Sequence, residues 1–128
     1  MPPEESRNPA DWLRIAEKEL RRVERSLSED SEAAGFWLQQ SLEKFLKAFL
    51  LAKGWKLRRI HDLEALLDDA LPFDPGLAQF RAACQEISDY YFVDRYPLPF
   101  AQGPTEADVR HCLETVRALI DKLRSAAR

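Results

Sequence analysis

One segment constrains the fold more than any other, the apolar run between Glu32 and Lys53. Its leucines and phenylalanines recur at helical spacing and cover more than half the circumference of a helix. They are Leu38, Leu42, Phe45, Leu46, Phe49 and Leu50. Gly54 follows directly and is a natural C-terminal stop for such a helix. Because an apolar surface this wide needs more than one neighbour to cover it, the segment predicts the central helix of an all-α protein.

Further helices are predicted on both sides of this segment. The first begins at the Asn8–Pro9 step, where asparagine can cap a helix and proline suits the first turn. The last begins after Thr105, and Asp108 three residues later completes a capping box. The helices outside the central one are expected at about 8–27, 62–71, 75–91 and 105–124, with a proline-containing loop over 92–104.

These elements, joined by short connections, predict an antiparallel four-helix up-and-down bundle with a short extra helix. The chain has 128 residues, which fits a single domain with its core over about residues 9–125. Only 4 of these residues are glycine, a composition that suits long helices better than a turn-rich β fold.

The overall charge argues against a general nucleic-acid-binding protein. The formal net charge is -3, whereas such proteins usually carry a strong basic excess. The polar N-terminus has no apolar signal-peptide core, and charged residues interrupt the longest apolar run. Cys84 and Cys112 belong to no CxxC pair. We therefore expect a cytoplasmic protein outside the membrane, with two buried free thiols.

Four short strings occur in a characteristic order along the chain. They are Asp11-Trp12-Leu13, the stretch Trp37 to Ala48 with its paired glutamines and Glu43-Lys44, His61-Asp62-Leu63, and Tyr90-Tyr91 followed by Asp94-Arg95-Tyr96-Pro97. In this order they resemble the HEPN family, the higher eukaryotes and prokaryotes nucleotide-binding domain. The likeness extends from about Asp11 to Leu123.

The resemblance implies a helical bundle that commonly dimerises. It also implies a separate partner, a minimal nucleotidyltransferase, in arrangements similar to toxin–antitoxin pairs. Some members of the family are ribonucleases, and others lack the catalytic motif and bind a nucleotide or a partner. The resemblance alone leaves these activities open.

The ribonuclease motif of the family is absent from this chain. Its catalytic members carry an arginine followed, slightly more than one helical turn later, by a histidine that moves a proton. Here His111 directly follows Arg110, and His61 follows Arg59 by two residues. His111 is interpreted as a surface residue. His61 is expected to cap the short helix or to pack beside Trp55, and a minority interpretation pairs it with Arg95 as catalytic residues.

A basic and aromatic cluster is the first candidate binding site. It comprises Lys53, Trp55, Lys56, Arg58, Arg59 and His61. Cations beside an aromatic ring suit a phosphate and a base. The alternative is structural, with Lys53 at the negative end of a helix and Trp55 covering the core.

A polar strip on the central helix is the second candidate. Gln40, Lys44 and Lys47 lie along one side of an otherwise apolar helix. Glu43 and Lys47 are four residues apart and suit a surface ion pair. The strip is thus either a solvated seam or the border of a cleft or of a dimer contact.

The third candidate is the segment that holds Tyr90, Tyr91, Arg95 and Tyr96. Tyrosine and arginine are favoured at interfaces, so the segment lines a groove or subunit boundary or is a plain structural turn. Asp68 and Asp69 form an acidic pair, interpreted as a solvated helix face, although adjacent carboxylates attract cations. No metal site and no resident cofactor are expected.

These observations favour a non-catalytic HEPN-type protein that binds a nucleotide or a partner. We expect a homodimer that acts with a nucleotidyltransferase-domain protein, with a nucleotide or RNA as ligand. One alternative is a ribonuclease toxin. Another is a structural adaptor that uses the wide apolar surface of the central helix.

Overall fold

The computed structural model describes residues 6–95 and 103–128, except for the side chains of residues 91–95. The described backbone is helical, with no strand, which confirms the all-α prediction. In chain order its elements are α1 (Pro9–Ser26), α2 (Ser31–Ala52), α3 (Leu63–Ala70), the 3₁₀ helix η2 (Pro75–Phe80), α4 (Arg81–Arg95) and α5 (Glu106–Ala127).

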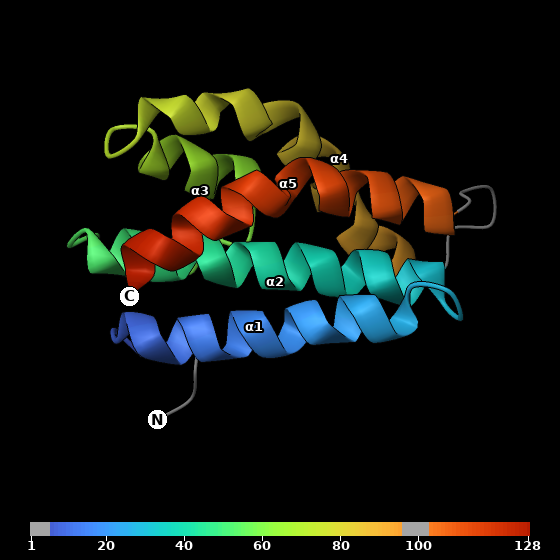
Figure 1. Cartoon of the computed structure of the whole chain (residues 1–128). Helices are drawn as coiled ribbons and strands as arrows, with labels where there is room; N and C mark the ends of the chain where they lie inside the picture. The colour runs from blue at the N-terminus through green and yellow to red at the C-terminus, as the bar shows by residue number, and fades with distance from the viewer. Residues whose placement is uncertain (1–5, 96–102) are drawn as a thin grey trace.

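Helix α2 occupies the centre of the molecule (Figure 1). It packs against α1, α3, α4 and α5, and α1 lies alongside it in the opposite direction. The residues of its apolar surface, among them Leu38, Leu42 and Phe45, are fully buried in the main core. The chain's own helices therefore cover the surface that the adaptor interpretation needed for a partner, and that interpretation was wrong about α2.

The ends of the helices follow the predicted caps. The Asn8 side chain accepts a hydrogen bond from the Ala10 amide at the start of α1. Gly54, just after α2, has φ +87°, a conformation that side chains with a Cβ adopt only at a cost. Thr105 and Asp108 form the reciprocal capping box of α5.

The fourth helix differs from the sequence prediction at both ends. Residues Pro75–Phe80 form a 3₁₀ helix, and α4 begins only at Arg81. Its last residue is Arg95, so the backbone stays helical beyond the predicted end at Tyr91. The first residue able to break the helix is Pro97, which disfavours helical backbone in the residue before it. Residues 92–95 were predicted to be loop, although none of them is a proline or a glycine.

Few apolar side chains remain outside the core. Among the described side chains, Phe73 is the one large hydrophobic residue that is exposed, at 45%. None of the helices that the structure describes is both long enough and apolar enough to reach across a bilayer.

Candidate functional site

A polar pocket of about 360 Å³ lies where α1, α2 and the segment after α2 meet. Its described lining residues are Trp12, Gln40, Glu43, Lys44, Lys47, Arg58, Arg59 and His61. Two of the candidate sites from the sequence, the strip on α2 and the basic segment after it, therefore form one site. The chain folds this way because Gly54 turns the backbone after α2 and residues 55–62 return beside that helix.

The strip on α2 is not a solvated seam. Glu43 is 3% exposed and Lys47 is 2% exposed, so the surface ion pair expected between them is a buried one. Burial separates both charges from water, a large cost that is offset only if each charge finds close partners. The surrounding side chains provide those partners.

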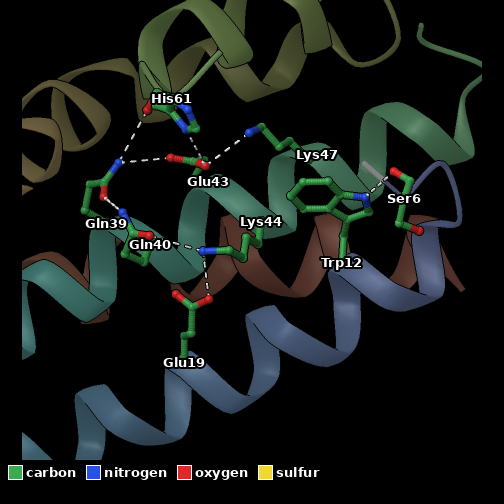
Figure 2. A network of polar contacts seen from close by, with 9 residues as sticks. All are labelled: Ser6, Trp12, Glu19, Gln39, Gln40, Glu43, Lys44, Lys47 and His61. Atoms are coloured by element: carbon green, nitrogen blue, oxygen red, sulfur yellow. Dashed lines mark hydrogen bonds and ion pairs between the residues drawn. The ribbon is translucent and has the colours of Figure 1, made fainter. Parts of the chain in front are cut away.

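Glu43 is the centre of the buried contacts (Figure 2). Its Oε2 lies 3.1 Å from Lys47 Nζ and 3.1 Å from His61 Nδ1. Its Oε1 accepts a hydrogen bond from Gln39 Nε2 at 3.4 Å. Because a carboxylate only accepts hydrogen bonds, Nδ1 of His61 carries a proton and Nε2 is directed elsewhere.

Glu19, on α1, forms the second buried ion pair of the site. Its Oε1 lies 2.7 Å from Lys44 Nζ, which also donates to Gln40 Oε1 at 3.2 Å. Burial raises the pKa of Glu19, and the nearby Lys44 ammonium opposes that rise. The other oxygen, Oε2, is buried and has no hydrogen-bond partner.

Glu19 and Gln39 are residues of the site that the sequence interpretation missed. Glu19 lies three residues after Ala16 and four before Val23, both fully buried on α1. A carboxylate at core spacing is a recognisable signal of a buried partner. Gln39 precedes Glu43 by one helical turn and lies within the family-like string from Trp37 to Ala48.

The aromatic wall of the pocket is Trp12, not Trp55. Trp12 is almost completely buried, its Nε1 donates to the Ser6 carbonyl at 2.8 Å, and its ring lies 5.1 Å from Lys47 Nζ (Figure 2). Trp55 packs against the main core, and its Nε1 donates to Asp69 at 3.0 Å. Trp55 thus follows the structural alternative, in which it covers the core.

The mouth of the pocket is basic. Arg58 and Arg59 are exposed there, and Arg58 Nη1 lies 3.4 Å from Asp69. Lys53 and Lys56 do not line the pocket. Asp68 pairs with Arg81, so the acidic pair is divided between two cations. The described residues contain no group of side chains suited to a metal ion.

His61 does not cap the short helix, which was one of the two structural roles expected for it. Asp62 caps α3, because its side chain accepts the Glu64 amide hydrogen. The His61 side chain is 70% exposed, with only its Nδ1 side directed to Glu43. The histidine therefore stands at the boundary between the buried contacts and solvent.

Comparison with protein families gives a match to the HEPN domain family over residues 9–126. The chain belongs to this family. No curated protein and no solved structure gave a significant match. The match runs from the first residue of α1 to the last turn of α5, so the family resemblance predicted from four short strings is confirmed.

The second histidine of this HEPN domain lies outside the pocket. His111 is exposed on α5, as predicted. Its carbonyl accepts a hydrogen bond from the Thr115 hydroxyl within the same helix. His61 is therefore the histidine that the described pocket contains.

The structure describes only part of the tyrosine segment of this HEPN domain. Tyr90 is buried, and its hydroxyl donates to Glu86 at 3.0 Å and lies 3.4 Å from Cys112 Sγ. Tyr91 and Arg95 belong to α4, but their side chains lie outside the described part of the chain, and so does Tyr96. The predictions for those three residues, including the Arg95 interpretation, remain predictions.

Both cysteines are buried and free, as expected. Burial raises the pKa of each thiol to about 12, with the hydrogen bond to Glu86 adding to the effect at Cys112. Such thiols stay protonated at neutral pH and are poor nucleophiles. The cysteines are part of the core rather than of the candidate site.

Proposed function

We propose that this HEPN domain binds a nucleotide, with the phosphates at the basic mouth of the pocket between α1, α2 and residues 55–62. The observation that carries the proposal is the meeting of two lysines from α2 with two arginines and a histidine from the following segment in one cavity. Anionic groups are bound in proteins by such converging donors.

The charges of the pocket differ from those of the chain. Lys44, Lys47, Arg58 and Arg59 line it against a single carboxylate, Glu43. Glu19 behind Lys44 and Asp69 beside Arg58 add two further carboxylates, so four cations stand against three carboxylates here, whereas the whole chain has a net charge of -3. A polyanion is therefore attracted to this part of an otherwise acidic surface.

The cations differ in their availability to a ligand. Lys47 is enclosed between Glu43 and the Trp12 ring, so it supplies charge without direct contact. Lys44 is 15% exposed and can reach a ligand while paired with Glu19. Arg58 and the exposed face of His61 are at the mouth, so we assign the first phosphate contacts to them. Trp12 is too buried to stack on a base.

Titration calorimetry with ATP, GTP, CTP and UTP tests the proposal. We expect saturable binding and a raised melting temperature, because a ligand that binds the folded state stabilises it. Arg58→Ala should weaken binding about tenfold, the value of one charge-assisted contact. Lys56→Ala is the matched control, since this exposed neighbour does not line the pocket. Absence of both heat and stabilisation with all four nucleotides would overturn the proposal.

We further propose that the chain is non-catalytic and forms a cytoplasmic homodimer. In this proposal it acts with a nucleotidyltransferase-domain protein in a toxin–antitoxin-like pair. Membership of the HEPN family and the absence of the arginine–histidine spacing support this. Light scattering should give twice the chain mass, and co-expression with the product of an adjacent nucleotidyltransferase reading frame should yield a stable complex. A monomer that does not associate with that product contradicts the pairing.

A ribonuclease is the second candidate, and one contact favours it. The buried Glu43 carboxylate holds His61 by Nδ1, which leaves Nε2 to exchange a proton, an arrangement used in acid–base catalysis. On this alternative the protein cleaves RNA, and His61→Ala abolishes the cleavage while the fold is retained. RNA left intact at high protein concentration would reject it.

A further inference from the structure

A second, larger cavity lies on the other side of His61. Its volume is about 720 Å³, and it is bounded by α2, the start of α3 and α4. Its described lining residues are Gln39, His61, Asp62, Glu64, Gln85, Ser88 and Asp89. His61 lines both cavities, and Gln39 of this one donates to Glu43 of the other. The two cavities are therefore adjacent, and the His61 side chain lies between them.

The two cavities have opposite chemical character. Three carboxylates, Asp62, Glu64 and Asp89, line the larger one, and none of its described lining residues is lysine or arginine. The phosphate pocket has four cations and one carboxylate. A ligand that extends across His61 would meet a basic region at one end and an acceptor-rich region at the other.

Most hydrogen-bond donors of the larger cavity are already used within the protein. Gln39 Nε2 donates to Glu43 and to the His61 carbonyl. Gln85 Nε2 donates to Glu64, which also receives a contact from Arg81.

Two polar groups of the same cavity have no hydrogen-bond partner within the described part of the protein. Asp89 makes no ion pair or hydrogen bond in the described part of the chain, and Ser88 Oγ is buried without a partner. Both can accept hydrogen bonds, and a carboxylate only accepts them. A buried polar atom without a partner is costly unless a ligand or water satisfies it. The cavity is therefore suited to a group that donates hydrogen bonds.

We propose that the nucleotide base occupies this cavity and that the site prefers bases that carry an exocyclic amino group. This rests on the proposed function, since the phosphates must lie in the basic pocket for the base to reach beyond His61. The amino group donates to Asp89, with Ser88 Oγ as a second acceptor. A base with a carbonyl at that position presents an acceptor to a carboxylate and is disfavoured.

Matched nucleotide pairs test the preference. ATP and ITP differ by an amino group against a carbonyl, and so do CTP and UTP. We expect the amino member of each pair to bind about tenfold more tightly, the ratio for one net hydrogen bond. Asp89→Ala should remove the preference. Asp89 is exposed, so the fold should tolerate the change. Glu114→Gln, an exposed carboxylate on α5, is the control that should keep it.

Inorganic tripolyphosphate separates this inference from the proposed function. It should bind to the wild type and to Asp89→Ala equally, because it occupies only the basic pocket. Binding of tripolyphosphate together with equal affinities within both nucleotide pairs would overturn the base preference and leave phosphate binding standing. Failure of tripolyphosphate and of every nucleotide to bind would overturn both. A preference that survives Asp89→Ala and Ser88→Ala would also overturn the inference.

Discussion

The two sides of α2 are buried by different means. On one side, leucine and phenylalanine side chains pack into the main core with residues of the other helices. On the other side, Gln39, Glu43 and Lys47 follow one another at intervals of four residues and are equally buried. The first side is stabilised by removing apolar area from water. The second is stabilised only because each buried charge has a close partner.

This difference explains why α1 and residues 55–62 matter to the polar side. Helix α1 supplies Glu19 to Lys44 and places the Trp12 ring over Lys47. The segment after α2 supplies His61 to Glu43. An apolar surface accepts any well-packed cover, whereas a charged one needs specific groups at hydrogen-bonding distance. On the polar side, therefore, a substitution that removes one charged side chain leaves another buried charge without its ion-pair partner.

The largest expected effect is the loss of Glu43. Glu43→Ala should lower the free energy of unfolding by about 4 kcal/mol, because Lys47 stays buried without its carboxylate. Denaturant unfolding followed by circular dichroism measures it. Phe45→Ala, on the apolar side, should cost a similar amount, about 3–5 kcal/mol, through a cavity.

A double variant distinguishes the two sides. Glu43→Leu combined with Lys47→Met removes both charges together and should recover most of the stability lost in Glu43→Ala, because an apolar pair of similar size replaces a buried ion pair at little cost. No second substitution of this kind exists for Phe45→Ala. If the double variant is as unstable as the single one, the loss does not come from an unpaired buried charge.

A smaller effect is expected at Gly54, the residue just before the segment 55–62 that packs beside the polar side of α2. Gly54→Ala should lower the free energy of unfolding by about 1 kcal/mol, since its φ of +87° disfavours a residue with a Cβ. Apart from Gly54 and its two chain neighbours, no residue has an atom within 4 Å of the added methyl group, so the cost is one of backbone conformation. Lys53→Ala, at a residue with φ -91°, should change stability by less than about 0.5 kcal/mol. Equal losses in both variants would point to the helix end in general.

The pH dependence of the free energy of unfolding should report the raised pKa of Glu19. The pKa of Glu19 is higher in the folded chain than its usual value of 4.5, so the folded state holds this proton more tightly than the unfolded state. Its contribution is fully present below that value and is lost as the pH rises through the folded pKa. The stability of wild type relative to Glu19→Gln should therefore fall as the pH is raised above 4.5. A constant difference across that range would contradict the raised pKa.

The sequence predicted the apolar side of α2 better than the polar one. Periodicity and caps placed the helices because apolar spacing and caps such as Asn8, Gly54 and Thr105 act locally. The end of α4 was missed because the loop was predicted from the prolines and the glycine of residues 92–104, although the first of these is Pro97. On the polar side, Lys44, Lys47 and the basic segment were identified, but their union into one pocket depends on how residues 55–62 return beside α2. That path is tertiary and is not encoded in any local pattern.

Whether Lys47 is exposed was likewise not decided by sequence. A Glu–Lys pair four residues apart has the same spacing on a solvated helix face and in a buried one. What decides between them is the neighbour, here Trp12 of α1, whose ring lies over the ammonium group. Glu19, which lies among buried positions of α1, does not decide it either, because its partner is Lys44 rather than Lys47. A carboxylate at core spacing in α1 and a lysine in the otherwise apolar α2 predict the Glu19–Lys44 pair, not the burial of Lys47.

The smallest expected effect on the free energy of unfolding is that of salt, which distinguishes exposed charges from buried ones. Raising NaCl from about 0.05 M to about 0.5 M screens exposed charges strongly and buried pairs little. The free energy of unfolding should change by less than about 0.5 kcal/mol, because Glu43–Lys47 and Glu19–Lys44 are shielded from solvent. Binding of tripolyphosphate should weaken several-fold over the same range, since Arg58 at the pocket mouth is exposed. If stability falls as steeply as binding does, the two lysine–glutamate pairs are open to water, and the contrast between the two sides of α2 does not hold in solution.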